Sequence, residues 1–243
     1  LIGIIDDQIS LSPNLKLFLI SLIITMILII DESLIINTLS FSFYQKEINL
    51  GYFSYFFTIL CFLLFVNAFN MLDGINGQSV SYLIFILLVF IFNKINILLV
   101  ISLFIPVITF LILNFRNKIF LGDSGSLSLG FFISYLFIDH YNLTKFIYCD
   151  EIFLVMIIPG FELLRLAIFR IINKKHPFKG DSNHIHHLLL KKNNFITTFL
   201  FVQLLLISPY VIYNLLNNGI LSIIISIIFY SLIIYRQSII KKK

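Results

Sequence analysis

The sequence of 243 residues is poor in charge, because Asp, Glu, Lys and Arg make up only 12% of it, whereas soluble domains usually contain roughly 25%. Hydrophobic residues make up 59%, and the mean hydropathy is +1.02. This composition excludes an ordinary soluble domain and indicates an integral membrane protein. Cysteine is scarce too, since only Cys61 and Cys149 are present. Two cysteines exclude a disulfide framework and a cysteine-based metal site, so we interpret both as packing residues.

The apolar residues form long runs separated by short polar segments. A transmembrane helix needs roughly 17–25 predominantly apolar residues to cross a hydrocarbon core of about 30 Å. Eight runs are candidates, of which the third and fifth are short: 15–30, 52–69, 80–92, 95–113, 127–137, 152–172, 195–215 and 220–235. We therefore predict an all-α, polytopic transmembrane helical bundle of about eight spans, forming a single domain over residues 1–243.

The basic residues are distributed unevenly between the two sides that these spans define. Of the 17 Lys and Arg residues, only Lys46, Lys94 and Lys145 fall on the side opposite the N-terminus. Cytoplasmic loops of membrane proteins carry the excess of positive charge, so the N-terminal side is predicted to be cytoplasmic. A net charge of +5 could suggest a nucleic-acid partner, but the placement of the basic residues on one side of the membrane explains it. We therefore predict no nucleic-acid partner.

Four segments on the predicted cytoplasmic side carry carboxylates, although they are far apart in the sequence. They are 3–13, 67–78, 114–130 and the His-rich loop 174–194. Proteins bind Mg²⁺ through one or two carboxylates together with phosphate oxygens, while Lys and Arg neutralise the remaining phosphate charge. The four segments together therefore indicate a site for metal and phosphate. Each one alone is equally compatible with a polar surface loop.

The first segment, GIIDDQISLSP, contains the adjacent residues Asp6 and Asp7. Two neighbouring carboxylates repel each other, which favours either a bound cation or a raised pKa of one carboxyl group. A carboxyl group with a raised pKa would suit a proton acceptor. The alternative is a helix cap formed by Asp7 or Ser10.

The second segment, NAFNMLDGINGQ, spaces Asn67, Asn70 and Asp73 three residues apart, which places them along one stripe of a helix. Unpaired amides are costly in contact with lipid, so we expect this stripe to face a cavity or another helix. Gly74 and Gly77 permit a tight turn and a close approach of the backbone to a ligand. Polar contacts between helices are the structural alternative.

The third segment, NFRNKIFLGDSGSLSLG, places Asp123 in a Gly- and Ser-rich turn before a helix that we predict to begin near Ser126. Such a turn presents free amides and a favourable dipole to an anion, and an aspartate there can hold a metal that bridges to it. A capped helix start would explain Asp123 and Ser124 without a ligand.

The fourth segment, KKHPFKGDSNHIHHLLLKK, contains four of the five histidines. On a helix, His184 and His187 would share one face and His186 would point elsewhere, so the segment has too few ligands for zinc and suits phosphate oxygens better. The alternative is an amphipathic interfacial helix. Upstream, Glu162 and Arg165 stand three residues apart within a span, and we interpret them as a structural ion pair that faces the bundle interior.

Together these segments resemble the signatures of the polyprenyl-phosphate N-acetylhexosamine-1-phosphate transferases of glycosyltransferase family 4. The order and approximate spacing agree over nearly the whole chain, and the HIHH form is more similar to the WecA/TagO branch than to MraY. The resemblance implies a multi-pass EC 2.7.8 enzyme of the bacterial plasma membrane with a cytoplasmic active site. Such an enzyme transfers an N-acetylhexosamine 1-phosphate, here GlcNAc-1-phosphate as the first choice, from a UDP-sugar to undecaprenyl phosphate and releases UMP. This is the first membrane step in the synthesis of cell-wall or lipopolysaccharide O-antigen polysaccharides.

The resemblance also implies roles for individual residues. Mg²⁺, with Mn²⁺ as the alternative, would be bound by Asp123 and Asp73. The implied catalytic residues are Asp6, Asp7, Asp73 and Asp123, and the implied substrate-binding residues are Asn67, Asn70, Asn76, Lys118, His184, His186 and His187. We expect direct attack of the lipid phosphate on the β-phosphorus, with a two-step route through an aspartyl phosphate as the rival. The sequence does not determine the oligomeric state, and a homodimer is the assembly that we consider.

The chain also departs from the family pattern. Family members usually have about three further spans before the aspartate pair, so we expect an N-terminally truncated chain. Asn76 stands where many relatives have aspartate, Ser182 where many have arginine, and Glu162 where aspartate is common. A noncatalytic or truncated remnant is therefore one alternative. A polytopic transporter is another, but it predicts ionisable residues near span midpoints and related sequence halves, which are not evident.

Overall fold

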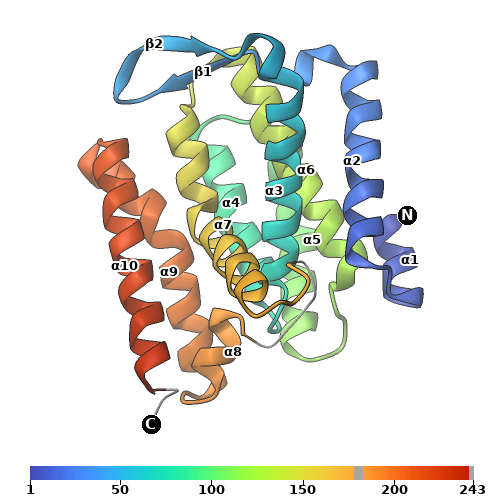
Figure 1. Cartoon of the computed structure of the whole chain (residues 1–243), viewed down its shortest axis with the longest axis vertical. Coiled ribbons are helices and arrows are strands. Elements are labelled where there is room, and N and C mark those ends of the chain that lie inside the picture. Colours follow the sequence, from blue (N-terminus) through green and yellow to red (C-terminus); the bar gives the residue numbers. More distant parts are fainter. Residues whose placement is uncertain (178–182, 241–243) are drawn as a thin grey trace.

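The computed structural model describes residues 1–177 and 183–240, which form a helical bundle with a small β-hairpin at one end (Figure 1). The helices are α1 Ile2–Ile9, α2 Pro13–Ile30, α3 Ser54–Leu72, α4 Gln78–Phe92, α5 Ile97–Phe115, α6 Gly122–Thr144, α7 Cys149–Ile172, α8 Ile185–Leu190, α9 Phe195–Leu216 and α10 Gly219–Ile240. Two 3₁₀ turns, Glu32–Leu34 and Gly51–Phe53, flank the hairpin strands β1 Thr38–Phe41 and β2 Tyr44–Asn49.

Each of the eight apolar runs in the sequence forms a helix. Among the described residues, six helices are long and apolar enough to cross a membrane: α2, α3 with its leading 3₁₀ turn, α5, α7, α9 and α10. Helix α4 is a shorter apolar helix of 15 residues, and α6 has 23 residues but opens with the polar sequence GDSGS. The prediction of a polytopic membrane bundle is confirmed. Apolar side chains such as Leu98 and Ile105 remain exposed on the outside of α5, as expected for a surface in contact with lipid.

Helix α3 lies in the middle of the bundle and packs against α6 and α7 (Figure 1). Phe62 of α3 stacks on Phe131 of α6 with ring centroids 5.4 Å apart. A β-carbon on Gly130 of α6 would lie only 2.9 Å from the α-carbon of Val66, so the absence of a side chain lets α3 and α6 approach closely. This close packing brings the end of α3 beside the start of α6, where the polar segments lie.

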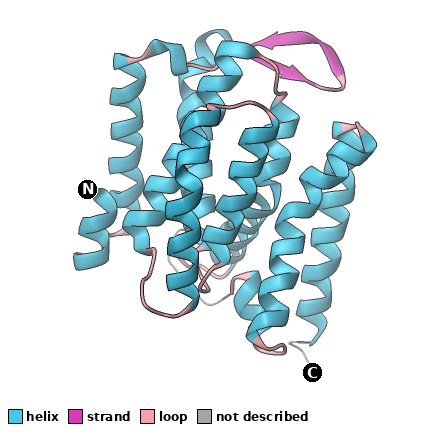
Figure 2. Ribbon diagram, turned by 180° about the vertical axis from the view of Figure 1, so that it is seen from behind, coloured by secondary structure: helices cyan, strands magenta, loops and turns pink. Residues whose placement is uncertain are grey.

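The β-hairpin was not predicted, and it lies at the end of the bundle opposite α8 (Figure 1); Figure 2 shows the hairpin from behind, in magenta. The strands pair antiparallel, and their side chains are largely exposed. The Tyr141 hydroxyl of α6 donates to Thr38 O and accepts from the Ser40 amide, both at 2.8 Å. These bonds, together with a hydrogen bond from the Ser42 amide to Asp150 Oδ1 at 2.8 Å, attach the hairpin to α6 and α7.

Candidate functional site

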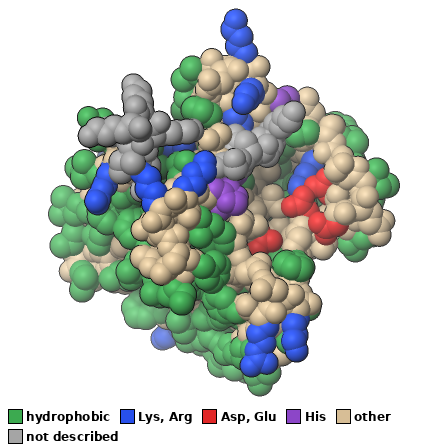
Figure 3. Space-filling view, turned by 90° about the horizontal axis from the view of Figure 1, so that it is seen from below, with side chains coloured by type: hydrophobic (Ala, Val, Ile, Leu, Met, Phe, Trp, Pro, Cys, Tyr) green, Lys and Arg blue, Asp and Glu red, His purple; other side chains and the backbone are tan. Residues whose placement is uncertain are grey.

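A cavity of about 380 Å³ opens at the end of the bundle opposite the hairpin. Seen from that end, acidic and histidine side chains gather around a hollow, with Lys and Arg nearby (Figure 3). All four polar segments identified in the sequence contribute to the lining, and Lys16 and Arg170 line it too. The predicted residues that line the cavity are Asp6, Asn67, Asn70, Asp73, Asp123, His184, His186 and His187.

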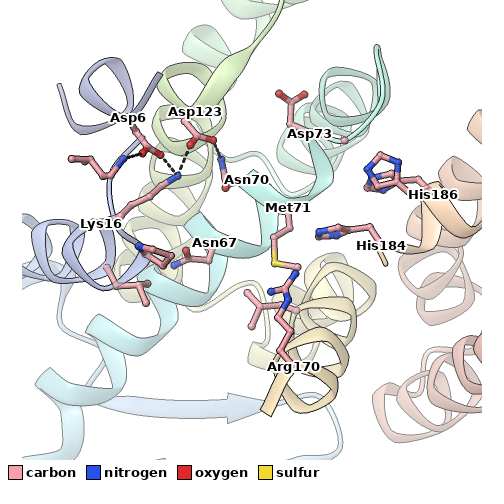
Figure 4. Close-up of a pocket in the computed structure, with 16 residues that line it drawn as sticks. Asp6, Lys16, Asn67, Asn70, Met71, Asp73, Asp123, Arg170, His184 and His186 are labelled. Atoms are coloured by element: carbon pink, nitrogen blue, oxygen red, sulfur yellow. Dashed lines mark hydrogen bonds and ion pairs between the residues drawn. The ribbon is translucent and has the colours of Figure 1, made fainter. Parts of the chain in front are cut away.

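The Lys16 side chain joins two of these segments (Figure 4). Its Nζ lies 2.6 Å from Asp6 Oδ2 and 2.5 Å from Asp123 Oδ2. Asn70 Nδ2 donates to Asp123 Oδ1 and to Ser126 Oγ, at 2.7 Å in both cases. The end of α3 and the starts of α2 and α6 therefore meet at one carboxylate.

Lys16 was missed in the sequence, although a signal for it was present. It is the only charged residue within the apolar run 15–30, and a lone charge in a span requires a partner. Ser12 and Pro13 begin α2 just before it, with Ser12 Oγ accepting from the Leu15 amide at 3.4 Å. This helix start places Lys16 in the first turn of α2.

Asp6 is held in its ionised form by its neighbours. Its contact with the Asp123 carboxyl group, followed by hydrogen bonds from Lys16 Nζ and from the Leu11 amide at 2.6 Å, lowers the pKa of Asp6 despite partial burial. Of the two alternatives for the adjacent aspartates, a bound cation or a raised pKa, the structure favours the first at Asp6, where the cation is the Lys16 ammonium group.

Asp7 caps helix α6 rather than its own helix. Its Oδ1 accepts from the Asp123 amide at 2.8 Å and its Oδ2 from the Ser124 amide at 3.0 Å. Burial opposes ionisation, but these two bonds outweigh it and lower the pKa of Asp7. Helix α6 begins at Gly122, not near Ser126, and the amides that we expected to be free for an anion bind Asp7. The close contact of α1 with α6 at Gly3, where a β-carbon would lie 2.3 Å from the Ser124 α-carbon, makes this possible.

Asp73 follows the last residue of α3 and accepts a hydrogen bond from Ser79 Oγ at 2.6 Å. Burial raises the pKa of Asp73 although the Ser79 bond acts in the opposite direction. Asp73 is thus a cavity carboxyl whose pKa is raised, whereas that of Asp6 is lowered. In Figure 4 it lies apart from the group formed by Asp6, Lys16 and Asp123.

The turn after Asp73 is tight, as predicted, since Gly77 has φ +81°. The backbone of this turn lies close to side chains of the same chain, and its approach to a ligand stays a prediction. A β-carbon on Gly74 would lie 1.8 Å from His186 Nε2, and one on Gly77 would lie 2.3 Å from the Phe115 ring.

The three histidines of the HIHH sequence all face the cavity, so the expectation that His186 points elsewhere is wrong. His184 precedes α8 in an extended conformation, with φ −61° and ψ 148°, and helical spacing does not apply to it. The rings of His184 and His186 stack with centroids 5.3 Å apart, and His186 and His187 lie 4.4 Å apart. Burial, followed by the charges of the other two histidines, lowers the pKa of His186 to about 3.

Two predicted substrate contacts do not line the cavity. Asn76 Nδ2 donates to Asn117 Oδ1 at the surface, and Lys118 is exposed in the turn after α5, where its amide donates to Leu113 O at 3.0 Å. Arg170, which we did not predict, does line the cavity, and its Nη1 donates to Pro177 O at 2.7 Å. An arginine in the last turn of a span on the basic side of the membrane was the available signal.

The sequence profile of Glycosyl transferase family 4 matches residues 1–141, which is more than half of the chain. The chain belongs to this family. It is 34% identical over 199 residues to the probable undecaprenyl-phosphate N-acetylglucosaminyl 1-phosphate transferase of Bacillus subtilis (strain 168), covering 78% of this chain and 54% of that protein. It is 26% identical over 202 residues to the undecaprenyl-phosphate alpha-N-acetylglucosaminyl 1-phosphate transferase of Salmonella typhi, covering 78% and 55%. The chain spans about half the length of the curated relatives it matches.

Two carboxylates lie close together at the Lys16 ammonium group. Asp6 Oδ2 and Asp123 Oδ2 share one ammonium group, so two carboxylates already converge on a single positive charge. Mg²⁺ needs one or two carboxylates and takes phosphate oxygens and waters for the rest. No group of three or more His, Cys, Asp or Glu side chains that could hold a metal ion occurs within the described ranges. Metal binding by Asp123 and Asp73 stays a prediction.

Proposed function

We propose that this chain transfers N-acetylhexosamine 1-phosphate, with GlcNAc-1-phosphate as the first choice, from a UDP-sugar to undecaprenyl phosphate. The observation that carries the proposal is the convergence of four distant polar segments on one cavity that contains carboxylates, Lys16, Arg170 and three histidines. Family membership and the names of the curated relatives support the same reaction. The reaction would initiate the assembly of a cell-envelope polysaccharide.

The proposed reaction is a direct displacement at phosphorus. An oxygen of the lipid phosphate forms a bond to the β-phosphorus of the UDP-sugar, the bond from that phosphorus to the bridging oxygen breaks, and UMP leaves with both bonding electrons. Phosphoryl transfer depends chiefly on positioning and on neutralising charge. Lys16 and Arg170 supply positive charge beside the cavity, where the phosphate groups would bind. The rival two-step route is tested by trapping a phosphorylated aspartate with labelled UDP-sugar.

Mg²⁺, or Mn²⁺ as the alternative, is the proposed cofactor, with Asp123 and Asp73 as protein ligands. Bound there, it would neutralise diphosphate charge and orient the phosphate oxygens. Asp7 holds the backbone amide of Asp123, so in this scheme Asp7 fixes the start of α6. Asn70 fixes the Asp123 carboxylate through its hydrogen bond to Oδ1.

We place the cavity at the cytoplasmic face of the bacterial plasma membrane. Its end of the bundle carries most of the basic residues, as the positive-inside rule requires of a cytoplasmic side. A polyprenyl chain stays in the bilayer while a nucleotide sugar stays in water, so their phosphates can meet only at an interface. A cavity at the ends of the spanning helices suits that meeting.

The test is Mg²⁺-dependent release of UMP from UDP-GlcNAc in the presence of undecaprenyl phosphate, using the full chain in detergent or liposomes. We expect Asp123→Asn to abolish release, and Glu47→Gln, which alters an exposed ion pair with Lys145 in the hairpin region, to leave it unchanged. Unaltered release by Asp123→Asn would contradict the assignment. Binding of UDP-GlcNAc without any UMP release by the unmodified chain would favour a noncatalytic member of the family.

A further inference from the structure

A buried carboxylate in α7 joins three helices just behind the cavity. Glu162 is only 5% exposed. Its Oε1 accepts from Arg165 Nη2 at 2.7 Å, and its Oε2 accepts from Arg165 Nε at 3.0 Å. The Tyr230 hydroxyl of α10 donates to Oε2, and the Ile185 amide, the first of α8, donates to Oε1 at 2.7 Å. The ion pair between Glu162 and Arg165 predicted from the sequence is confirmed, but it has further partners.

Arg165 extends the same network to the chain before α8. Its Nη2 donates to Asn183 O at 2.8 Å, and its Nε also donates to the Tyr230 hydroxyl at 3.1 Å. Asn183 and Ile185 are the two neighbours of His184. The pair in α7 therefore holds the backbone on both sides of this histidine.

Helix α8 depends on such support because it has only six residues. A helix this short is unstable by itself, since one turn gains few hydrogen bonds for the backbone order that it requires. The Glu162 carboxylate accepts from its first amide and favours its positive end. On the other side, the absence of a side chain at Gly74 leaves room for the His186 ring.

Pairing between α7 and α10 alone would not require these backbone bonds. A pair of charges buried between helices often contributes little to stability, because desolvation offsets the attraction between them. The network also forms hydrogen bonds with the backbone of the segment 183–187, which carries the three cavity histidines. Positioning of that segment explains why the charges lie there.

We propose that Glu162, Arg165 and Tyr230 are positioning residues that hold the histidine segment 184–187 against the phosphate-binding cavity. Through Tyr230, helix α10 then contributes to substrate binding, although none of its described side chains lines the cavity. This inference rests on the proposed function only for the identity of the ligand, a nucleotide sugar. The placement of the histidines is a separate, measurable property.

The first experiment measures the placement of the histidines without any substrate. Diethyl pyrocarbonate modifies accessible imidazoles, and mass spectrometry reports the modification of each histidine. Glu162→Gln keeps the shape of the side chain but removes its charge, and Tyr230→Phe removes only the hydroxyl. We expect modification of His186 to rise about threefold or more in Glu162→Gln and less in Tyr230→Phe, because local opening exposes a buried ring. Glu47→Gln, in the exposed ion pair at the other end, is the matched control and should change nothing.

The second experiment measures binding of UDP-GlcNAc to the same variants by calorimetry. We expect a roughly tenfold rise in Kd for Glu162→Gln, the effect of losing a hydrogen bond to a charged group. Unchanged modification of all three histidines in both variants would overturn the inference. A second outcome separates the two proposals. If the variants show raised histidine modification but the chain without substitutions does not bind UDP-GlcNAc, the positioning network is sustained and the proposed function is contradicted. If Glu162→Gln does not fold, the histidine modification measured in Tyr230→Phe alone decides whether the inference holds.

Discussion

Lys16 Nζ lies 2.5 Å from Asp123 Oδ2, although 107 residues separate the two in the sequence. The same ammonium group contacts Asp6 Oδ2, so one cation keeps two carboxylates together. In the proposed reaction this site receives a diphosphate, which brings further negative charge. Lys16 therefore has two tasks, to neutralise the carboxylates before substrate binds and to neutralise phosphate afterwards.

The first prediction concerns the charge of Lys16. Lys16→Met leaves Asp6 and Asp123 facing each other without a cation, and we expect UMP release to fall about 100-fold or more. Lys16→Arg keeps the charge but changes its geometry, so we expect intermediate activity. The assay is the initial rate of UMP release at saturating Mg²⁺. Lys145→Met, in the exposed pair with Glu47, is the control, and an equal loss in that variant would refute a specific role for Lys16.

The second prediction concerns Asp7 as the cap of α6. Asp7→Ala leaves the amides of Asp123 and Ser124 without their carboxylate, and we expect the melting temperature to fall by roughly 2–4 °C. The pKa of Asp7 is lowered in the fold, so its contribution is fully present above the usual aspartate pKa of about 3.9. That contribution is lost as the pH falls through the lower pKa of the folded state. The melting temperatures of the two chains should therefore converge in strong acid, and a constant difference down to that range would contradict the cap.

The third prediction concerns Asp73, whose pKa is shifted the other way. Burial disfavours its ionised form, so the folded state loses stability as the pH rises from the usual aspartate pKa through the raised one. Asp73→Asn removes this cost, and we expect a variant that melts at a higher temperature at pH 7 but not below about pH 4. It should also be inactive in UMP release. A variant less stable than the unmodified chain at pH 7 would show that the ionised Asp73 is stabilised by its surroundings.

Much of the fold was accessible from the sequence because a bilayer restricts the choices. Each apolar run had to form a helix, and polar residues at the end of a run could not face lipid. Asn70 and Asp73 were placed correctly for this reason. The convergence of the four segments followed from their common side of the membrane. The hairpin could not be predicted in this way, because Thr38 and Ser40 are held by Tyr141 from a distant part of the chain.

The details of the site depended on packing that no local pattern records. Asp7 and the amides of α6 are 116 and 117 residues apart, and they meet only because α1 lies against α6 at Gly3. The helical spacing of the histidines failed because Glu162 and Arg165 hold the chain around His184 in an extended form. Asn76 and Lys118 were placed near the cavity from the resemblance alone, and tertiary packing turns both toward the surface.

The fourth prediction concerns a buried amide at the start of α4. The Gln78 side chain is 0% exposed, and within the described ranges neither its nitrogen nor its oxygen has a hydrogen-bond partner. A buried unpaired amide costs about 1–3 kcal/mol, so Gln78→Leu should raise the melting temperature. Gln203→Leu is the comparison variant, for which we expect the opposite result. Gln203 Nε2 donates to the backbone oxygen of Gln78 at 2.8 Å, and the loss of this hydrogen bond should lower the melting temperature. Destabilisation by both variants would indicate that Gln78 has a partner such as an ordered water.

The last prediction uses two glycines with opposite surroundings. An added methyl group on Gly74 would lie 1.8 Å from His186 Nε2, so the ring must move away from the cavity edge in Gly74→Ala. We expect weaker binding of UDP-GlcNAc, by roughly tenfold, and greater modification of His186 by diethyl pyrocarbonate. Gly160, inside α7, has nothing within 4 Å of the corresponding position, and Gly160→Ala should leave binding unchanged while stabilising the helix by about 0.5–1 kcal/mol. Normal binding by Gly74→Ala together with a displaced His186 would mean that this imidazole does not contact the nucleotide sugar, and His184 and His187 would then be the histidines to test.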